Sequence, residues 1–162
     1  MNTMTRLLLL IACLALPLAA CKKEPPPPPP KAALTAPTTE DPAAWRAYVS
    51  DVVTRNMGEI TNQPYVYLLP GESTPDFQGN YDRLLDKAKM DVARGIIKGN
   101  MLAYASPSSA KMADIVVDAF TGIEPNTMKG VKVLFIGAAA DNPRVQAAVA
   151  PAGVDYVFVE AK

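Results

Sequence analysis

The sequence predicts a small three-layer α/β sandwich, with about four mainly parallel strands, connecting helices and an additional N-terminal helix. Two observations predict this fold. Beyond residue 40, four segments place apolar residues every three or four positions, which is the pattern of an amphipathic helix. Short apolar runs alternate with these segments, and Gly, Pro and Asp separate the two kinds. Because helices that join consecutive strands favour right-handed parallel crossovers, we expect a sheet covered on both faces.

The first helix is predicted to begin at Asp41 and Pro42, because Asp caps free amides and Pro fits the first helical turn. Gly58 is expected to end it. Residues 65–69 then form a strand that Pro70 stops. The apolar face of the helix consists of Trp45, Tyr48, Val49, Val52, Val53 and Met57.

The second and third helices are predicted on either side of a strand at residues 101–105. The second helix starts its apolar face at Tyr81 and ends near Gly95. Ser106 and Pro107 begin the third helix by the same capping argument. The remaining apolar positions are Leu84, Leu85, Ala88, Val92 and Ala93 in the second helix and Met112, Ile115, Val116, Ala119 and Phe120 in the third.

The C-terminal quarter predicts two more strands around a fourth helix. Gly122 closes the third helix, and residues 131–136 form the most continuous apolar run, as expected of a strand buried on both faces. The sequence Asp-Asn-Pro at 141–143 opens the fourth helix, and residues 154–159 form the last strand. The apolar positions of this helix are Val145, Ala148 and Val149.

The N-terminal segment predicts export. Arg6 precedes an apolar run at 7–16, and small residues follow Pro17, in the order of a secretory signal peptide. The run of about ten residues is shorter than the roughly twenty that a membrane-spanning helix needs.

The sequence Leu-Ala-Ala-Cys, which ends at Cys21, resembles the lipobox of bacterial lipoproteins. The resemblance implies a signal peptide at 1–20, cleavage between Ala20 and Cys21, a diacylglyceryl group on the sulfur and an acylated amine such as a palmitate amide. Each buried acyl CH₂ contributes about 0.8 kcal/mol, so several chains hold a protein in a membrane. Lys22 stands where lipoproteins of the enteric inner membrane carry aspartate, which implies the outer membrane, facing the periplasm.

Residues 21–40 are expected to form a lipidated, disordered tether before a single domain at 41–162. Residues 25–30 are six consecutive prolines, which favour polyproline II at ~3.1 Å per residue. A spacer is the favoured interpretation, and a ligand for an aromatic-lined groove is the alternative.

Composition limits the chemistry of the domain. The protein has no histidine, Cys13 lies in the signal peptide, and lipid occupies Cys21, so no thiol remains for a disulfide, a nucleophile or zinc. The domain holds 12 Lys and Arg against 14 Asp and Glu, a net charge of −2 without a basic run, so we expect no nucleic-acid partner. No cofactor or metal is predicted. A carboxylate cluster for Mg²⁺ or Ca²⁺ is the weaker alternative, formed by Glu72, Asp76, Asp141 and Glu160.

Candidate ligand-binding residues follow the strands, because ligands of open α/β sheets bind beyond the strands' carboxyl ends. Ser106, Ser108 and Ser109 precede a helix, where hydroxyls and free amides suit an anion. With Lys111 they could form a Ser–Lys pair. Helix capping by Ser106 is the favoured interpretation.

A second candidate set follows the 131–136 strand. Gly137, Asp141 and Asn142 stand between a strand and a helix, as in a dinucleotide site, but that fingerprint needs three glycines. A tight turn at Gly137 and a cap from Asp141 or Asn142 are therefore favoured.

Aromatic residues offer another possible groove, for a sugar or a peptide. Trp45 and Tyr48 share a helical face, which favours core packing, and Tyr65 and Tyr67 share one face of a strand. Phe77 lies in a polar segment and is the least explained by packing.

Three functions remain open from the sequence. The favoured one is a non-catalytic interaction module, held in the membrane through its N-terminal lipid and serving an envelope protein complex. The alternative is a small-ligand-binding or hydrolase domain that uses the loops at the strand ends. The third is a mainly structural lipoprotein.

Overall fold

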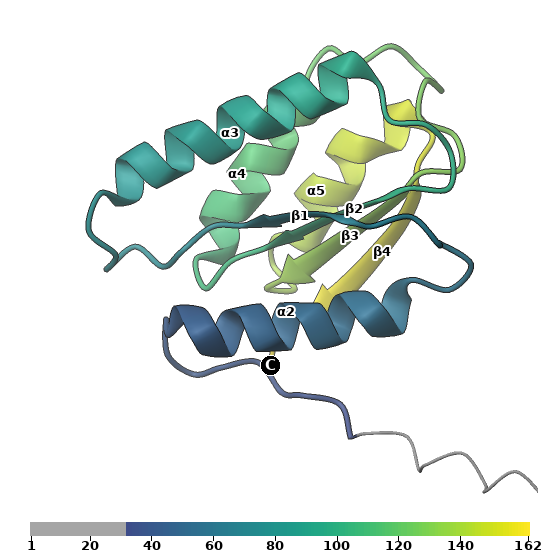
Figure 1. Cartoon of the computed structure of the whole chain (residues 1–162). Helices are drawn as coiled ribbons and strands as arrows, with labels where there is room; N and C mark the ends of the chain where they lie inside the picture. Colours follow the sequence, from purple (N-terminus) through teal and green to yellow (C-terminus); the bar gives the residue numbers. More distant parts are fainter. Residues whose placement is uncertain (1–31) are drawn as a thin grey trace, which may run out of the picture. The chain divides into compact units, whose positions relative to one another are not determined.

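Four strands form one parallel sheet in the order β1-β2-β3-β4 (Figure 1). The computed structural model describes residues 32–162. The strands are β1 (Tyr65–Leu68), β2 (Met101–Ala105), β3 (Lys132–Gly137) and β4 (Asp155–Glu160). Their positions agree with the four predicted strands to within one residue at either end.

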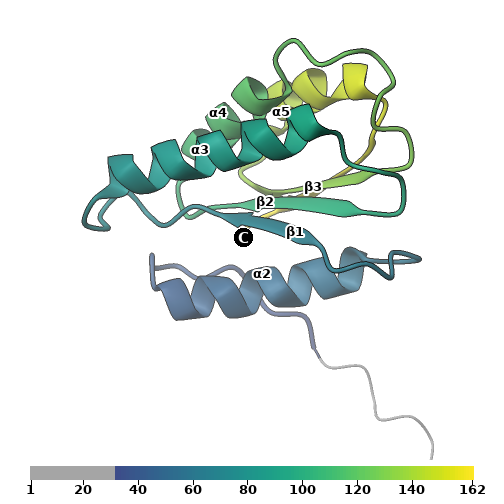
Figure 2. The same ribbon diagram turned by 45° about the horizontal axis from the view of Figure 1, so that its top comes forward.

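The helices form two layers, one on each face of the sheet (Figure 2). Each crossover runs to the next strand in the same direction, so its right-handedness places every connecting helix on one face. These helices are α3 (Phe77–Arg94), α4 (Ser109–Phe120) and α5 (Asn142–Val149), the last followed by a 3₁₀ turn, η1 (Ala150–Ala152). Helix α2 (Pro42–Asn56) precedes the sheet and covers the other face. The predicted three-layer α/β sandwich is confirmed.

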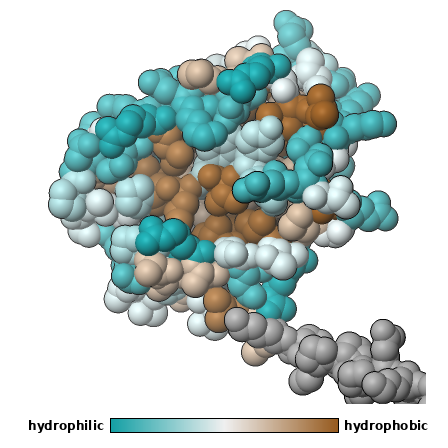
Figure 3. Space-filling model, viewed as in Figure 1, coloured by the Kyte–Doolittle hydropathy of each residue, from teal (hydrophilic) through white to brown (hydrophobic). Residues whose placement is uncertain are grey.

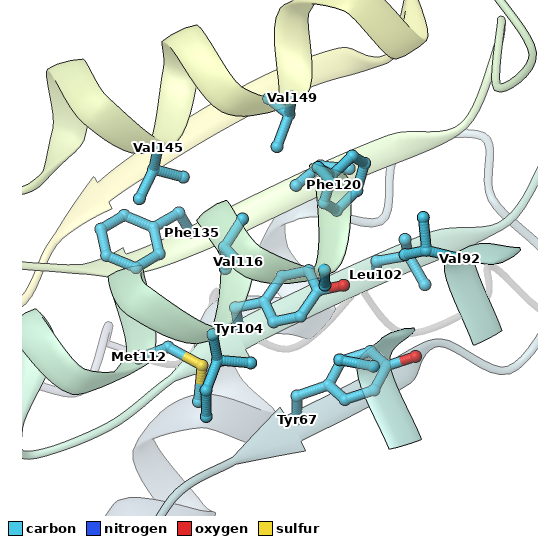
Figure 4. Close-up of a cluster of buried hydrophobic side chains, with 14 of the residues drawn as sticks. Tyr67, Val92, Leu102, Tyr104, Met112, Val116, Phe120, Phe135, Val145 and Val149 are labelled. Atoms are coloured by element: carbon cyan, nitrogen blue, oxygen red, sulfur yellow. The ribbon is translucent and has the colours of Figure 1, made fainter. Parts of the chain in front are cut away.

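Each face of the sheet has its own apolar core. The central strands bury both faces, with Leu102 and Tyr104 of β2 pointing toward the three helices and Met101 and Ala103 toward α2. This burial is the reason that β2 and β3 show no alternation of polar residues. On the three-helix side, Tyr67 and Tyr104 belong to one apolar cluster with side chains of all three helices (Figure 4).

The helix starts agree with expectation at α2 and differ at α3 and α4. The Asp41 carboxylate caps α2 by accepting from the Ala44 amide at 2.7 Å. Helix α3 begins at Phe77, four residues before Tyr81, because Phe77 itself packs against the core. Helix α4 begins at Ser109, so the expected cap at Ser106 is wrong.

The compact unit begins at Ala32, nine residues before the expected domain start. Residues 32–40 lie against the domain rather than in a tether. The Leu34 amide donates to the Asp51 carboxylate at 3.1 Å, the Ala36 amide to the Lys162 carbonyl at 3.2 Å, and the Trp45 indole to the Thr39 carbonyl at 2.8 Å. These hydrogen bonds explain why the domain starts earlier than expected, because a Pro- and Thr-rich composition does not indicate them.

Two features of the sequence lie outside the described residues, namely the signal peptide with Cys21 and the proline run. Within residues 32–162, no helix combines the length and the apolar character needed to cross a bilayer.

Candidate functional site

The loops at the carboxyl ends of β2 and β3 are joined through Ser109. Its hydroxyl donates to an Asp141 carboxylate oxygen at 2.7 Å and accepts from the Ala138 amide at 2.7 Å. Gly137 permits this approach, since a Cβ there would lie 2.5 Å from the Ser109 oxygen. Three of the six predicted ligand-binding residues, Ser109, Gly137 and Asp141, therefore meet at one point.

The other three predicted residues have separate partners. The buried Ser106 hydroxyl accepts from the Ser108 amide at 2.9 Å, so it holds the turn before α4. Asn142 Oδ1 accepts from the Tyr156 hydroxyl at 2.8 Å. Burial raises the pKa of Tyr156 to about 12, which keeps this hydroxyl protonated at neutral pH.

Asp141 is engaged by a cation as well as by Ser109. Arg144 contacts Asp141 at 2.9 Å, pairs with Asp114 of α4 and donates to the Ala110 carbonyl at 2.7 Å. The Asp141 side chain forms no cap for α5, which corrects that expectation, because Ser109 and Arg144 occupy its oxygens. The Lys111 ammonium makes no hydrogen bond to a serine among the described residues, and no group of three metal-ligating side chains occurs there. This network fastens two loops and two helices together.

A cavity of about 290 Å³ opens at the carboxyl end of β1. It reaches two of the four predicted loops, at Pro70 and Thr74 and at Pro107, but not the loops after β3 and β4. The strand order explains this partial convergence. Ligand crevices of open sheets form where the order reverses and neighbouring loops diverge, and the order 1-2-3-4 has no reversal.

A second depression, which we call the edge groove, runs between α2 and β1. Its volume is about 280 Å³, and it shares Arg46 and Leu68 with the cavity at the end of β1. Arg46 is its one charged residue. Figure 3 shows apolar surface gathered in the middle of this face, bordered by hydrophilic side chains. The groove is lined by Arg46, Val49, Ser50, Val53, Thr54, Met57, Gln63, Pro64, Val66 and Leu68.

Strand β1 is an edge strand, and it pairs with β2 on one side. The Leu69 amide donates to Ala105 of the β2 end at 3.1 Å, so alternate residues 65, 67 and 69 direct their backbone groups inward. Val66 and Leu68 direct their N–H and C=O groups away from the sheet. Pro64 and Pro70 also face this side but have no N–H, so the amide donors of the free edge are those of Val66 and Leu68.

The side chains of β1 are divided between its two faces. Val66 is 47% exposed beside the groove, and Tyr65 is 38% exposed on the three-helix side. Tyr67 is buried, and its hydroxyl donates to Asp91 of α3 at 2.8 Å. Lys87 also contacts Asp91, at 2.5 Å, and lies 4.9 Å from the Tyr67 ring centre. Helix α3 thus holds the inner face of the edge strand.

Asp91 is charged despite its burial. Burial alone would raise the pKa of its carboxyl, but hydrogen bonds from Lys87 and Tyr67 and the nearby Arg94 lower it below its usual range. Burial raises the pKa of Tyr67 far above that of a free tyrosine. The pair is therefore a tyrosine donor and a carboxylate acceptor, without a group poised to exchange protons near neutral pH.

The aromatic residues do not gather in one groove. Trp45 and Tyr48 pack edge to face in the core under α2, and Phe77 packs beside Tyr81 on the other side of the sheet. Val66 was not among the residues predicted from the sequence. The feature that indicates its position at a sheet edge is a proline on either side of a short strand. Pro64 and Pro70 have backbones that point to the same side as that of Val66, and such prolines are typical of an edge strand.

The site consists of an edge strand, an apolar groove and a small cavity, with the polar loop residues engaged in internal bonds. Neither protein-family models, nor curated proteins, nor solved structures match this chain.

Proposed function

We propose that this protein is an outer-membrane lipoprotein, anchored through Cys21, whose domain binds an envelope protein without catalysis. The partner supplies an extended segment that lies along the free edge of β1. The observation that carries the proposal is that edge itself, with Val66 half-exposed beside an apolar groove.

The backbone of β1 supports strand addition. An added strand takes affinity from main-chain hydrogen bonds and specificity from pockets for alternate side chains. Val66 and Leu68 offer the main-chain groups, and the edge groove offers the pocket. Pro64 and Pro70 limit the pairing to a short segment, which protects the edge from the open-ended pairing that leads to aggregation.

The lining of the groove supports a partner segment with apolar side chains. Val49 and Val53 of α2 and Met57, which follows the helix, line the groove, with Ser50 and Thr54 as short polar neighbours. An apolar side chain at every second position of the partner would point into this groove. Arg46, at the end nearest the cavity, favours a carbonyl or a carboxylate there.

The polar residues of the strand ends support a non-catalytic role. Ser109 and Asp141 are within hydrogen-bond reach, but a nucleophilic serine also needs a base, and Asp141 is paired with Arg144. A Ser–Lys mechanism lacks the required contact from Lys111 among the described residues.

A small-ligand site is the alternative, and the cavity of about 290 Å³ favours it. This volume is near the lower limit of ligand pockets. Arg46, Thr74 and Asn80 supply polar groups, and Trp45 supplies an apolar wall. A ligand there would contact none of the six residues that the sequence selected.

The proposal predicts which amides a partner protects. A photo-crosslinking residue at position 66 in the intact lipoprotein is expected to give a discrete adduct in cells, and the adduct identifies the partner. Addition of that partner segment to the purified protein should then slow hydrogen exchange at the Val66 and Leu68 amides. The Tyr67 amide, already bonded to β2, should change little.

The matched control places the crosslinker at Met90, which is 61% exposed on α3 and far along the chain from β1. A Val66→Glu change should abolish the interaction without unfolding the domain, because Val66 is exposed. Equal adducts from positions 66 and 90, or protection elsewhere than in β1, would contradict the proposed edge. Protection limited to residues around Asn80 would favour the small-ligand alternative.

A further inference from the structure

The loop between α3 and β2 presents an isoleucine to solvent. Ile97 is 75% exposed, the highest value among the exposed large apolar side chains of the described residues, whereas its neighbour Ile96 is 8% exposed and packs in the core. Figure 3 shows apolar surface at this end of the molecule, beyond the C-terminal end of α3. Neither the edge groove nor the cavity includes Ile97.

Specific bonds hold this loop in place. Gly95 and Gly99 have φ of +82° and +83°, a conformation that L side chains rarely adopt, so the loop turns sharply at both ends. The Asn100 side chain, 8% exposed, donates to the Ile97 carbonyl at 3.0 Å, and the Gly99 amide donates to Gly130 at 2.9 Å. Ile97 therefore projects from a braced turn.

Basic side chains lie near the projecting isoleucine. A shallow hollow of about 640 Å³ beside it is lined by Arg94, Lys98 and Lys129, and no acidic residue of the described chain lines it. Arg94 reaches Asp91 only at 3.9 Å. Glu124 lines an adjoining hollow, which shares Arg94, Gly95 and Thr127 with this one. The Lys98 Cβ lies 3.1 Å from the position that a Cβ on Gly130 would occupy, so the start of the Lys98 side chain packs closely against Gly130.

We propose that this end of the domain is a contact site for an anionic phospholipid surface, where Ile97 enters the interface and Arg94, Lys98 and Lys129 contact lipid phosphates. Peripheral proteins bind such surfaces through an exposed apolar side chain with basic side chains beside it. The hollow is shallow and holds one exposed apolar residue, too little for the core of a stable protein interface.

The length of the preceding chain supports this occupant. Ten residues, 22–31, separate Cys21 from the compact unit, and even a fully extended chain of that length reaches at most about 36 Å. This argument from chain length rests on the proposed anchor. With Cys21 in the bilayer, the distance between the domain and the lipid would not exceed about the diameter of the domain. Weak contacts suffice at such a local concentration.

The contact would also orient the proposed partner site. Ile97 and Lys129 belong to loops that precede β2 and β3, at the amino ends of the strands. A bilayer at that end leaves the carboxyl ends of the strands, with the cavity beside β1, facing away from the lipid. The edge of β1 stays open along its length.

The test uses the unlipidated chain that begins at Lys22, sedimented with vesicles of phosphatidylglycerol and phosphatidylcholine or of phosphatidylcholine alone. Binding is expected only with the anionic lipid and should weaken with salt. Lys98→Gln and Lys129→Gln should each weaken it about fivefold, and Ile97→Ser about tenfold. Met90→Ser at an exposed position and Lys111→Gln at a half-buried one, both elsewhere in the domain, should leave it unchanged.

An Ile97→Trp variant provides a direct signal of insertion. Its emission should shift to shorter wavelength with anionic vesicles, and an aqueous quencher should lose access to it. The native Trp45 is buried under α2 and should respond to neither.

Three outcomes would overturn the inference. They are absence of binding to anionic vesicles, equal binding to neutral ones, and equal weakening by the control variants. A chain that begins at Ala32 and retains both cores must still bind, because otherwise Lys22, Lys23 and Lys31 carry the effect. Each failure leaves the β1 edge untouched, since exchange at Val66 and Leu68 tests that separately.

Discussion

Tyr67 and Tyr104 stack ring on ring in the core, with centres 4.6 Å apart, yet their hydroxyls differ in partners. The Tyr67 hydroxyl donates to Asp91. The Tyr104 hydroxyl is fully buried and has no hydrogen-bond partner among the described residues. A buried polar group without a partner destabilises a fold, whereas a satisfied one contributes to it.

The two tyrosines should therefore respond oppositely to loss of the hydroxyl. Tyr104→Phe should leave the free energy of unfolding unchanged or raise it by about 1 kcal/mol, because it removes an unsatisfied group. Tyr67→Phe should lower it by roughly 1–2 kcal/mol, because Asp91 loses a donor. Urea unfolding followed by circular dichroism measures both. Destabilisation by Tyr104→Phe as large as that by Tyr67→Phe would mean that the Tyr104 hydroxyl has a partner, such as buried water.

At the scale of elements, α3 fastens the edge strand through one carboxylate. Asp91 accepts from Tyr67 of β1 and from Lys87 of its own helix. The edge strand has a neighbouring strand on one side only, so this side-chain bond replaces part of what a second strand would supply.

This attachment predicts a pH dependence. The pKa of Asp91 is lowered in the folded protein, so its contribution is present above the unfolded value near 3.8 and is lost as the pH falls through the folded value. Asp91→Asn should lower the free energy of unfolding by about 1–2 kcal/mol at pH 7. The difference from the native protein should shrink toward pH 3.

The control for this prediction is Asp86→Asn, an exposed carboxylate on the same helix. It should change stability little at either pH. A cost of Asp91→Asn that stays constant from pH 7 to pH 3 would contradict the charged state of Asp91.

At the scale of the whole molecule, the simple strand order decides where a partner can bind. All the crossovers run the same way, so the sheet has no reversal and no central crevice. Helix α2 covers the face that the connecting helices leave open, and its border with β1 forms the edge groove. The arrangement places Val66 and an apolar groove at the edge of the sheet.

The whole unit also includes residues 32–40. The Glu40 carboxylate accepts from the amide of Ser73 at 3.1 Å and from its hydroxyl, which ties this segment to the loop after β1. The free energy of unfolding of a chain that begins at Asp41 should be about 2–4 kcal/mol lower than that of one that begins at Ala32, because five such hydrogen bonds, most of them exposed, are lost.

Trp45 provides the readout for that truncation. Its indole loses the Thr39 carbonyl and part of its cover, so its emission should shift to longer wavelength. Chains that begin at Lys22 and at Ala32 should be equally stable. Equal stability of the Ala32 and Asp41 chains would mean that residues 32–40 only rest on the surface.

The sequence by itself determined the elements and their parallel arrangement. The period of the apolar residues is a local property, so it located every strand to within a residue at either end. It also identified most of the apolar faces of the four helices, although Ala93 of α3 is exposed and Phe77, which packs against the core, was not included. Asp41 and Pro42 likewise specified the start of α2, because a cap acts over one turn. The lipid anchor at Cys21 is a prediction of the same local kind, from four residues.

The tertiary structure alone decided the strand order and everything that depends on it. Ser109 meets Asp141 because β2 and β3 are neighbours, whereas Asn142, one residue further, turns to Tyr156. The local pattern of apolar residues does not indicate that Val66 and Ile97 are exposed, and only the position of β1 at an edge and of Ile97 on a turn leaves them so. Such contacts join residues far apart in the chain, and no local period encodes them.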